Sequence, residues 1–283
     1  MHQYEQAIKT VEACKSQLSS PNNLDASKLV SSLNQILREF CPHSHELHIL
    51  RTELLLHARK FASADACSSE LLMMRPGAAP ASLVPLMNHL RARAKFALGD
   101  FQATIQYEKI AIQSDPDNRQ FLALFKKAKA LADLKAQAND LFKAAKFDDA
   151  KQLYLKAIEI LDQPAAPDSD EQQQSLITAV FDLNLAAVLQ AQSKTEEALD
   201  RSNRALQKYP YYTKAFLRRG KSLMLLSRFE DAIAAFQQGL GSLNEDSYAA
   251  YSTSSTTTTE TSEAAAMKED LEAQLKQASL WLP

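Results

Sequence analysis

Apolar and small residues recur at helical spacing along most of the chain. RKFASADACSSELLMMRP, GDFQATIQYEKIAIQSDP, AKFDDAKQLYLKAIEILD, SKTEEALDRSNRALQKYP and SRFEDAIAAFQQGLGSLN follow one template. An aromatic or small residue comes first, a small residue follows three positions later, and an aliphatic run then ends at proline or a polar residue. Each stretch predicts the second helix of a pair, and the preceding segment, such as ELHILRTELLLHA, predicts the first.

The period of this pattern indicates a repeat fold. The small residue of each unit falls at Val30, Ala64, Thr104, Ala150, Ala198 and Ala232. The steps from 30 to 64 and from 198 to 232 equal the period of about 34 residues of the tetratricopeptide repeat. The chain therefore resembles a tetratricopeptide-repeat protein over roughly residues 12–246. We expect an all-α solenoid of about six repeats in two blocks, with a C-terminal capping helix.

Composition changes suggest where the parts of the chain begin and end. A proline-rich insertion, QPAAPDSDEQQQS, predicts a loop. The hydroxyl-rich YSTSSTTTTETSE predicts a linker, with phosphorylation as the alternative role. The expected parts are an N-terminal block (1–118), a connecting helix (119–133), a C-terminal block (134–246), the linker (247–263) and a final amphipathic helix (264–283).

Charge and cysteine content narrow the classes of function. A net charge of −2 over 283 residues does not suggest a nucleic-acid or membrane binder. No apolar run has the length of a membrane span or forms a signal-peptide core. Cys14, Cys41 and Cys67 are odd in number and far apart, which favours a reduced compartment, the cytoplasm or nucleus, and buried packing roles over catalysis.

The tripeptide Gly220-Lys221-Ser222 resembles part of a phosphate-binding loop. The full motif needs a second glycine at position 215, and that position holds Ala215. No strand is predicted before it, so we reject nucleotide binding and expect no cofactor. In repeat register, Gly220 lies midway along a first helix, where a small residue permits close helix packing.

The same register predicts which side chains line the inner groove of the solenoid. Groove residues fall at positions 2, 5, 6 and 9 of each first helix, and packing residues at 4, 8 and 11. In the last three units the groove positions carry four cations, two amides and no carboxylate: Ala132, Lys135, Ala136, Asn139, Val180, Leu183, Asn184, Ala187, Lys214, Leu217, Arg218 and Lys221. This row of cations predicts binding of an acidic, extended peptide.

Groove positions of the first three units serve as an internal comparison. Their charges are mixed: Glu12, Lys15, Ser16, Ser19, Glu46, Ile49, Leu50, Glu53, Leu86, His89, Leu90 and Arg93. Four of them, Ile49, Leu50, Leu86 and Leu90, form an apolar stretch that suits either a client-binding surface or an interface between repeats. We expect the two halves to bind different partners.

Five of the cations and amides resemble the carboxylate clamp of chaperone-binding tetratricopeptide domains: Lys135, Asn139, Asn184, Lys214 and Arg218. The resemblance implies that the first four hold the terminal aspartate of a Glu-Glu-Val-Asp tail and that Arg218 reaches further up the peptide. It implies that Phe142 and Ala187 help to line a valine pocket. The implied partners are the heat-shock chaperones of the seventy- and ninety-kilodalton classes. Leu185 departs from the family, where arginine is frequent.

The layout of two repeat blocks resembles J-domain co-chaperones that carry tetratricopeptide repeats, as in CPHSHELHILRTELLLHARKF and KALADLKAQANDLFKAAKFDDAKQLYLKAI. In that family a J domain with a His-Pro-Asp loop follows the repeats, and this sequence has no His-Pro-Asp. We expect a relative or fragment that lacks the J domain, so ATPase stimulation is not carried over. The expected function is a non-enzymatic co-chaperone adaptor, in which the last three repeats bind a chaperone tail and the first three contact a client, a second chaperone or the protein itself. The alternative is a scaffold that binds internal peptide segments.

One further cluster could suggest a metal site. Cys41, His43, His45 and His48 lie close together in CPHSHELH, and cysteine with histidine is a zinc-binding composition. His48, however, falls at a packing position, and the four residues span a turn between repeats. We expect no metal there.

Overall fold

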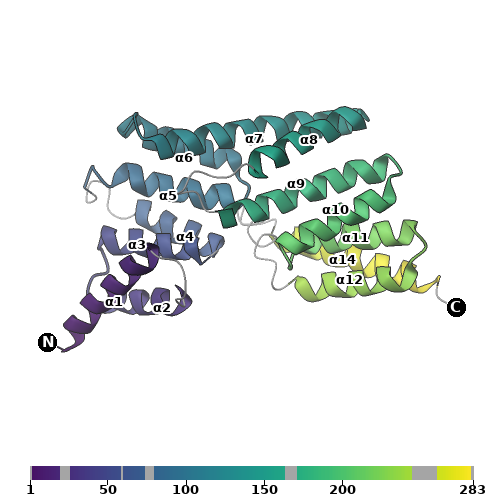
Figure 1. Cartoon of the computed structure of the whole chain (residues 1–283). Helices are drawn as coiled ribbons and strands as arrows, with labels where there is room; N and C mark the ends of the chain where they lie inside the picture. Colours follow the sequence, from purple (N-terminus) through teal and green to yellow (C-terminus); the bar gives the residue numbers. More distant parts are fainter. Residues whose placement is uncertain are drawn as a thin grey trace. The chain divides into compact units, whose positions relative to one another are not determined.

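The computed structural model describes residues 2–19, 26–58, 60–73, 80–162, 171–243 and 260–281, where the regular secondary structure is helix alone (Figure 1). The helices, in chain order, are α1 (His2–Ser19), α2 (Ala26–Glu39), α3 (His45–His57), α4 (Phe61–Met73), α5 (Val84–Ala97), α6 (Phe101–Ser114), α7 (Arg119–Lys143), α8 (Phe147–Asp162), α9 (Glu171–Ala191), α10 (Thr195–Lys208), α11 (Thr213–Leu225), α12 (Phe229–Ser242) and α14 (Glu260–Ser279). The predicted all-α fold is confirmed.

Two compact units divide the chain, unit 1 (Met1–Lys129) and unit 2 (Ala130–Pro283). Helix α7 has residues in both units, and it joins the expected connecting helix and the first helix of the next repeat in one helix. The hydroxyl-rich tract, except for its last residues in α14, lies outside the described residues. Of the loop predicted over residues 163–175, residues 163–170 also lie outside the described residues, and residues 171–175 are helical, because α9 already begins at Glu171.

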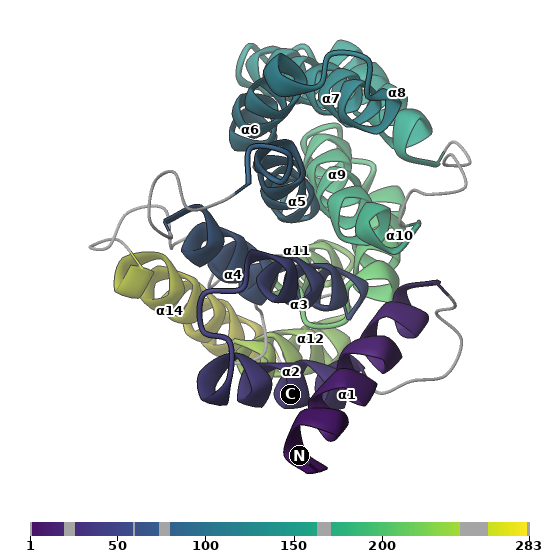
Figure 2. The ribbon, with the colours of Figure 1, turned by 90° about the vertical axis from the view of Figure 1, so that its left-hand side faces the viewer.

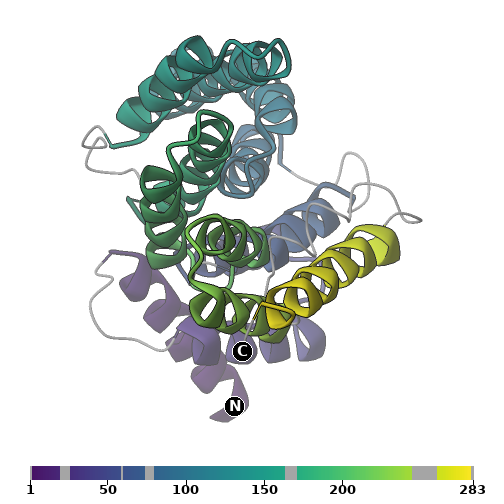
Figure 3. The ribbon, with the colours of Figure 1, turned by 90° about the vertical axis from the view of Figure 1, so that its right-hand side faces the viewer.

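Within each unit, successive helices pack on one another. In unit 1, α3 packs on α4, α4 on α5, and α5 on α6 (Figure 2). In unit 2 the order runs from α8 through α12, and α14 packs on α12 (Figure 3). The helices of these pairs therefore bury apolar residues against their chain neighbours, which is how a stack of helix pairs builds a continuous core.

The small residues that define the repeat lie in that core. All six anchors are buried, as the packing interpretation requires: Val30, Ala64, Thr104, Ala150, Ala198 and Ala232. They stand on the second helix of each pair, where a larger side chain would hold the two helices apart.

The turn inside four of the pairs has one conformation. A residue five positions before the anchor has a positive φ: Gly99 (74°), Ala145 (57°), Ser193 (60°) and Ser227 (58°). In each turn its N–H bonds to the carbonyl three residues earlier, and the next N–H bonds to the carbonyl five residues earlier, as in Gly99 to Phe96 and Asp100 to Lys95. This is a Schellman ending, which satisfies the last carbonyls of the first helix.

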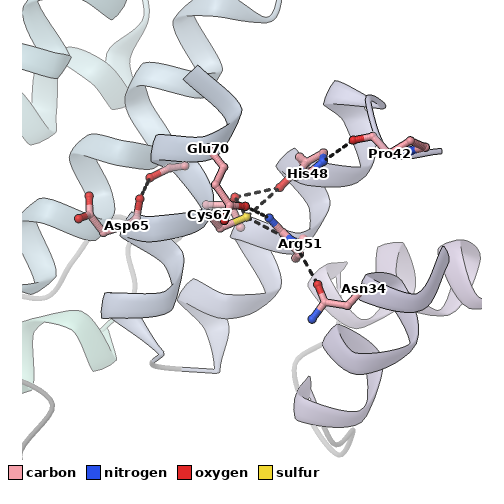
Figure 4. Close-up of polar contacts among 9 residues, drawn as sticks. Asn34, Pro42, His48, Arg51, Asp65, Cys67 and Glu70 are labelled. Carbon is pink, nitrogen blue, oxygen red and sulfur yellow. Dashed lines mark hydrogen bonds and ion pairs between the residues drawn. The ribbon is translucent and has the colours of Figure 1, made fainter. Parts of the chain in front are cut away.

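Arg51 links three helices of unit 1 (Figure 4). Its Nη1 donates to Asn34 Oδ1 of α2 at 3.1 Å, and its Nε donates to Cys67 Sγ of α4 at 2.9 Å. Its Nη2 pairs with Glu70 Oε2 at 2.8 Å. Burial raises the pKa of the Cys67 thiol, although bonds from Thr52 and Arg51 oppose that shift. Cys67 is therefore a buried, protonated thiol in the packing role predicted for it.

Gly220, in the tripeptide that resembled a phosphate loop, lies where α11 crosses α12. A Cβ at this position would overlap the ring of Phe236. Phe236 is fully buried in the cluster that joins α12 to α14, so its ring has little room to move. The glycine is needed for helix approach, as its repeat register predicts.

We predict that Gly220→Ala lowers the free energy of unfolding by about 1–3 kcal/mol, because the added methyl group overpacks the interface. Gly241→Ala is the matched control, since no heavy atom lies within 4 Å of its added Cβ. Alanine there should raise stability by roughly 0.5–1 kcal/mol through helix propensity. Urea denaturation of both variants measures this, and equal stabilities would contradict the packing role.

Candidate functional site

The sequence-predicted site residues lie on three helices of unit 2, and all are half-buried: Lys135, Asn139 and Phe142 on α7, Asn184 and Ala187 on α9, and Lys214 and Arg218 on α11. The packing positions beside them, Ala138, Ala186 and Gly220, are buried as predicted. Three expected groove residues are buried too, namely Ala132, Val180 and Leu183. These apolar side chains pack between helices and are not part of an open groove.

Helix α11 carries three cations along one stripe. Lys214, Arg218 and Lys221 are spaced i, i+4 and i+7, which places them on the same helix face. No carboxylate in the described part of the chain makes an ion pair with Lys214. A half-buried ammonium without a counter-charge is well placed to bind an anion, because partial desolvation strengthens its pairing with one.

The guanidinium of Arg218 is hydrogen-bonded to the neutral side chain of Gln190. Its Nη1 donates to Gln190 Oε1 at 2.9 Å, across the contact between α9 and α11. Gln190 Nε2 donates in turn to Ser222 Oγ at 2.7 Å and to the Arg218 carbonyl at 3.3 Å. Burial lowers the pKa of the Arg218 guanidinium, and Tyr212 opposes the shift. An arginine stays charged in proteins, so Arg218 is an oriented, partly desolvated cation.

The side-chain amide oxygen of Asn139 already accepts a hydrogen bond within unit 2. Tyr154, on α8, donates its hydroxyl to Asn139 Oδ1 at 2.5 Å. Burial raises the pKa of Tyr154, which keeps the phenol protonated and able to donate. Because the amide oxygen is already used, Asn139 is left with its NH₂ group as the donor for a ligand. A donor is what a carboxylate needs.

Several other cations of unit 2 have carboxylate partners. The buried Asp182 on α9 accepts from Arg201 Nη1 at 3.0 Å and from Lys208 Nζ at 3.3 Å, both on α10. Arg228, the residue before α12, pairs with Asp231 of that helix at 2.6 Å. These pairs hold neighbouring helices or turns together. They are therefore structural, and they differ from Lys214, for which the described residues provide no counter-charge.

Lys221 has a carboxylate partner, although the groove positions of the last three units carry none. Its Nζ lies 3.0 Å from Asp270 Oδ2 of α14. The sequence interpretation considered the repeat helices only, and it gave α14 the role of a cap. Packing of α14 on α11 and α12 brings its acidic face to the end of the stripe.

One solved structure and two curated proteins are similar to this chain. No family model matches it. The crystal structure of the P58(IPK) TPR domain matches 97% of this chain and 67% of its own, with a TM-score of 0.61 and 16% sequence identity. At 16% identity the match shows the fold alone. That fold agrees with the repeat indicated by the six buried small residues, from Val30 to Ala232. The chain has the tetratricopeptide-repeat fold.

Curated relatives of this chain include DnaJ homologues. It is 30% identical to the "DnaJ homolog subfamily C member 7 homolog" of Schizosaccharomyces pombe over 151 residues, which is 53% of this chain and 30% of the relative. It is 25% identical to the human "DnaJ homolog subfamily C member 7" over 214 residues, which is 76% of this chain and 40% of the relative. The chain thus spans less than half the length of the relatives it matches.

In unit 1 the structure favours one of the two alternatives for the apolar stretch and corrects one expectation about the cysteines. Ile49, Leu50 and Leu90 are buried, so this part of the apolar stretch is an interface between helices and not an exposed client-binding surface. Cys14 and Cys67 are buried as predicted, but Cys41 is exposed, because it lies in the turn between α2 and α3 and not on a helix face.

The histidine-rich turn is held by a backbone contact. His48 Nε2 lies 3.1 Å from the Pro42 carbonyl oxygen, and burial lowers the pKa of His48. In the described residues no group of three or more His, Cys, Asp or Glu side chains is placed to hold a metal.

The described residues contain no helix with the length and apolarity of a membrane span.

A buried acid–base pair joins α5 to α6 in unit 1. His89 Nδ1 lies 2.6 Å from Glu108 Oε1. Burial lowers the pKa of His89 to about 3 and raises that of Glu108 to about 9. At neutral pH the carboxyl is therefore protonated and donates to the imidazole. His89, expected as a groove residue, has an internal partner instead.

Gln190 is the site residue that the sequence did not identify. It lies seven residues after Leu183 and three after Ala187, so it continues the groove face of α9 by one turn. Gln190 falls at position 12 of its repeat helix, beyond the groove positions 2, 5, 6 and 9. Extending the same periodicity would have found it.

We predict that Gln190→Ala lowers the free energy of unfolding by about 1–2 kcal/mol, since the hydrogen bonds to Arg218 and Ser222 are lost. Gln237→Ala, at an exposed position of α12, should change it by less than about 0.5 kcal/mol. Chemical denaturation compares the two variants. If the two variants have the same free energy of unfolding, Gln190 does not hold α9 to α11.

Proposed function

We propose that unit 2 is a chaperone-binding adaptor that grips the acidic C-terminal tail of a heat-shock chaperone of the seventy- or ninety-kilodalton class. The proposed carboxylate clamp consists of Lys135, Asn139, Asn184, Lys214 and Arg218. The observation that carries the proposal is Lys214, a half-buried cation that no carboxylate in the described residues neutralises.

Each member of the clamp has a distinct role in the proposal. The ammonium groups of Lys135 and Lys214 pair with the two carboxylates of a terminal aspartate, its side chain and its chain end. Asn139 and Asn184 donate amide hydrogens to the same oxygens or to the peptide backbone. Arg218, held by Gln190, binds an acid further up the peptide.

An apolar pocket beside the clamp would take the valine of a Glu-Glu-Val-Asp tail. Phe142 is half-buried and packs at 5.6 Å, ring centre to ring centre, on Phe147. Ala187 is half-buried and small. Contact with both residues would remove the valine side chain from water and add affinity to the charged contacts.

The curated relatives support this class of function, because they are DnaJ homologues. The adaptor we propose has no catalytic role and works in the cytoplasm or nucleus, where a reducing environment keeps Cys14, Cys41 and Cys67 as thiols. Its role is to bring a chaperone, held by unit 2, together with client proteins.

We predict that Lys214→Ala and Arg218→Ala each weaken binding of a Glu-Glu-Val-Asp peptide by about 10- to 150-fold. This corresponds to the loss of roughly 1.5–3 kcal/mol per charge-assisted hydrogen bond. Isothermal titration calorimetry with the full chain measures the affinities.

The matched control is Lys156→Ala, which removes the same charge from an exposed position of α8. Its affinity for the peptide should stay within about twofold of the original, because an exposed charge outside the groove is screened by solvent. Equal losses in Lys156→Ala and Lys214→Ala would indicate attraction by general charge and would contradict a clamp.

A further inference from the structure

Helix α14 is anchored firmly beside the cation stripe. Its Leu271 and Ala278 are fully buried in a cluster with Phe236 of α12. The approach depends on Gly239, since a Cβ there would lie 3.0 Å from Leu271 Cδ2. At the end of the helix, Trp281 stacks on Phe229 at 5.8 Å with an interplanar angle of 11°. The backbone position of Asp270, next to Leu271, is therefore fixed.

Asp270 uses that position to neutralise one groove cation. Its Oδ2 accepts from Lys221 Nζ at 3.0 Å, with side-chain exposures of 40% for Asp270 and 39% for Lys221. The three cations of α11 thus differ in their partners. Lys214 has no carboxylate partner in the described residues, Arg218 has the neutral amide of Gln190, and Lys221 has a carboxylate.

We propose that Asp270 is a specificity-determining residue that limits the groove to the last few residues of an acidic tail. This inference rests on the proposed clamp. Lys221 lies seven residues beyond Lys214, about 10 Å further along α11. An acid upstream in a bound peptide would have to displace Asp270 to reach Lys221, and it would also be repelled by the displaced carboxylate.

The size of the effect follows from the exposure of the pair. A partly exposed ion pair is weakly stabilising, so Asp270 can be displaced, and the affinity gained from one upstream acid is correspondingly small. With Asp270 removed, Lys221 becomes a further half-buried cation without a carboxylate. An upstream glutamate should then add up to about fivefold in affinity.

The test compares two peptides that end in Glu-Glu-Val-Asp, one preceded by two glutamates and the other by two glutamines. Each is titrated into the full chain and into Asp270→Asn. In the unchanged protein we expect the two affinities to agree within about twofold. In Asp270→Asn the glutamate peptide should bind about fivefold more tightly than the glutamine peptide, and Lys221→Gln added to Asp270→Asn should abolish that preference.

Glu269→Gln is the matched control, because it removes a charge from the adjacent, exposed position of α14. It should leave the two peptides equal within about twofold. Fluorescence of Trp281, the one tryptophan of the chain, verifies that α14 stays docked in every variant. A glutamate preference of the same size in the unchanged protein, Glu269→Gln and Asp270→Asn would overturn the role of Asp270.

The experiment separates this inference from the clamp itself. If Lys214→Ala weakens binding of both peptides while Asp270→Asn changes no preference, the clamp stands and the inference fails. If neither peptide binds the unchanged protein, both proposals fall. Loss of binding in Asp270→Asn with normal Trp281 fluorescence would also overturn the inference, because removal of a competing carboxylate cannot weaken an acidic ligand.

Discussion

Close approach between neighbouring helices is the constraint on which the rest of the structure depends. A single helix pair cannot hide its apolar face, so it must stack on the next pair, and each contact needs a small residue where the helices cross. Ala150, Ala198 and Ala232 meet this need within the pairs, and Gly220 meets it against Phe236. In the first helix of each pair, one face packs against neighbouring helices. The polar residues on the other face stay half-buried and are held at fixed spacing.

Because of this fixed spacing, the polar side chains of α11 lie along one face of the helix. Lys214, Arg218 and Lys221 stand on one stripe because helical geometry leaves them no other arrangement. Their partners then decide what each can bind. A neutral amide orients Arg218 without neutralising it, whereas Asp270 neutralises Lys221. Function in such a groove depends as much on which cations are already paired as on how many there are.

Periodicity in the sequence was enough to predict the helices, the buried anchors and the packing role of Gly220, because these depend on local spacing. It did not reveal contacts between helices far apart in the chain. The pair between Lys221 and Asp270 joins residues 49 positions apart, and Gln190 reaches Arg218 across 28. The burial of Leu183 and Leu90 at expected groove positions has a related cause, since the width of each packed face depends on neighbouring helices.

The central claim is that unit 2 recognises a free chain end through the groups around Lys214. The most direct measurement compares a Glu-Glu-Val-Asp peptide that has a free C-terminal carboxylate with the same peptide amidated at its C-terminus. Amidation removes one negative charge and leaves every side chain in place. The account predicts a loss of at least about tenfold in affinity. Equal affinities would contradict it and would indicate a groove that binds internal peptide segments.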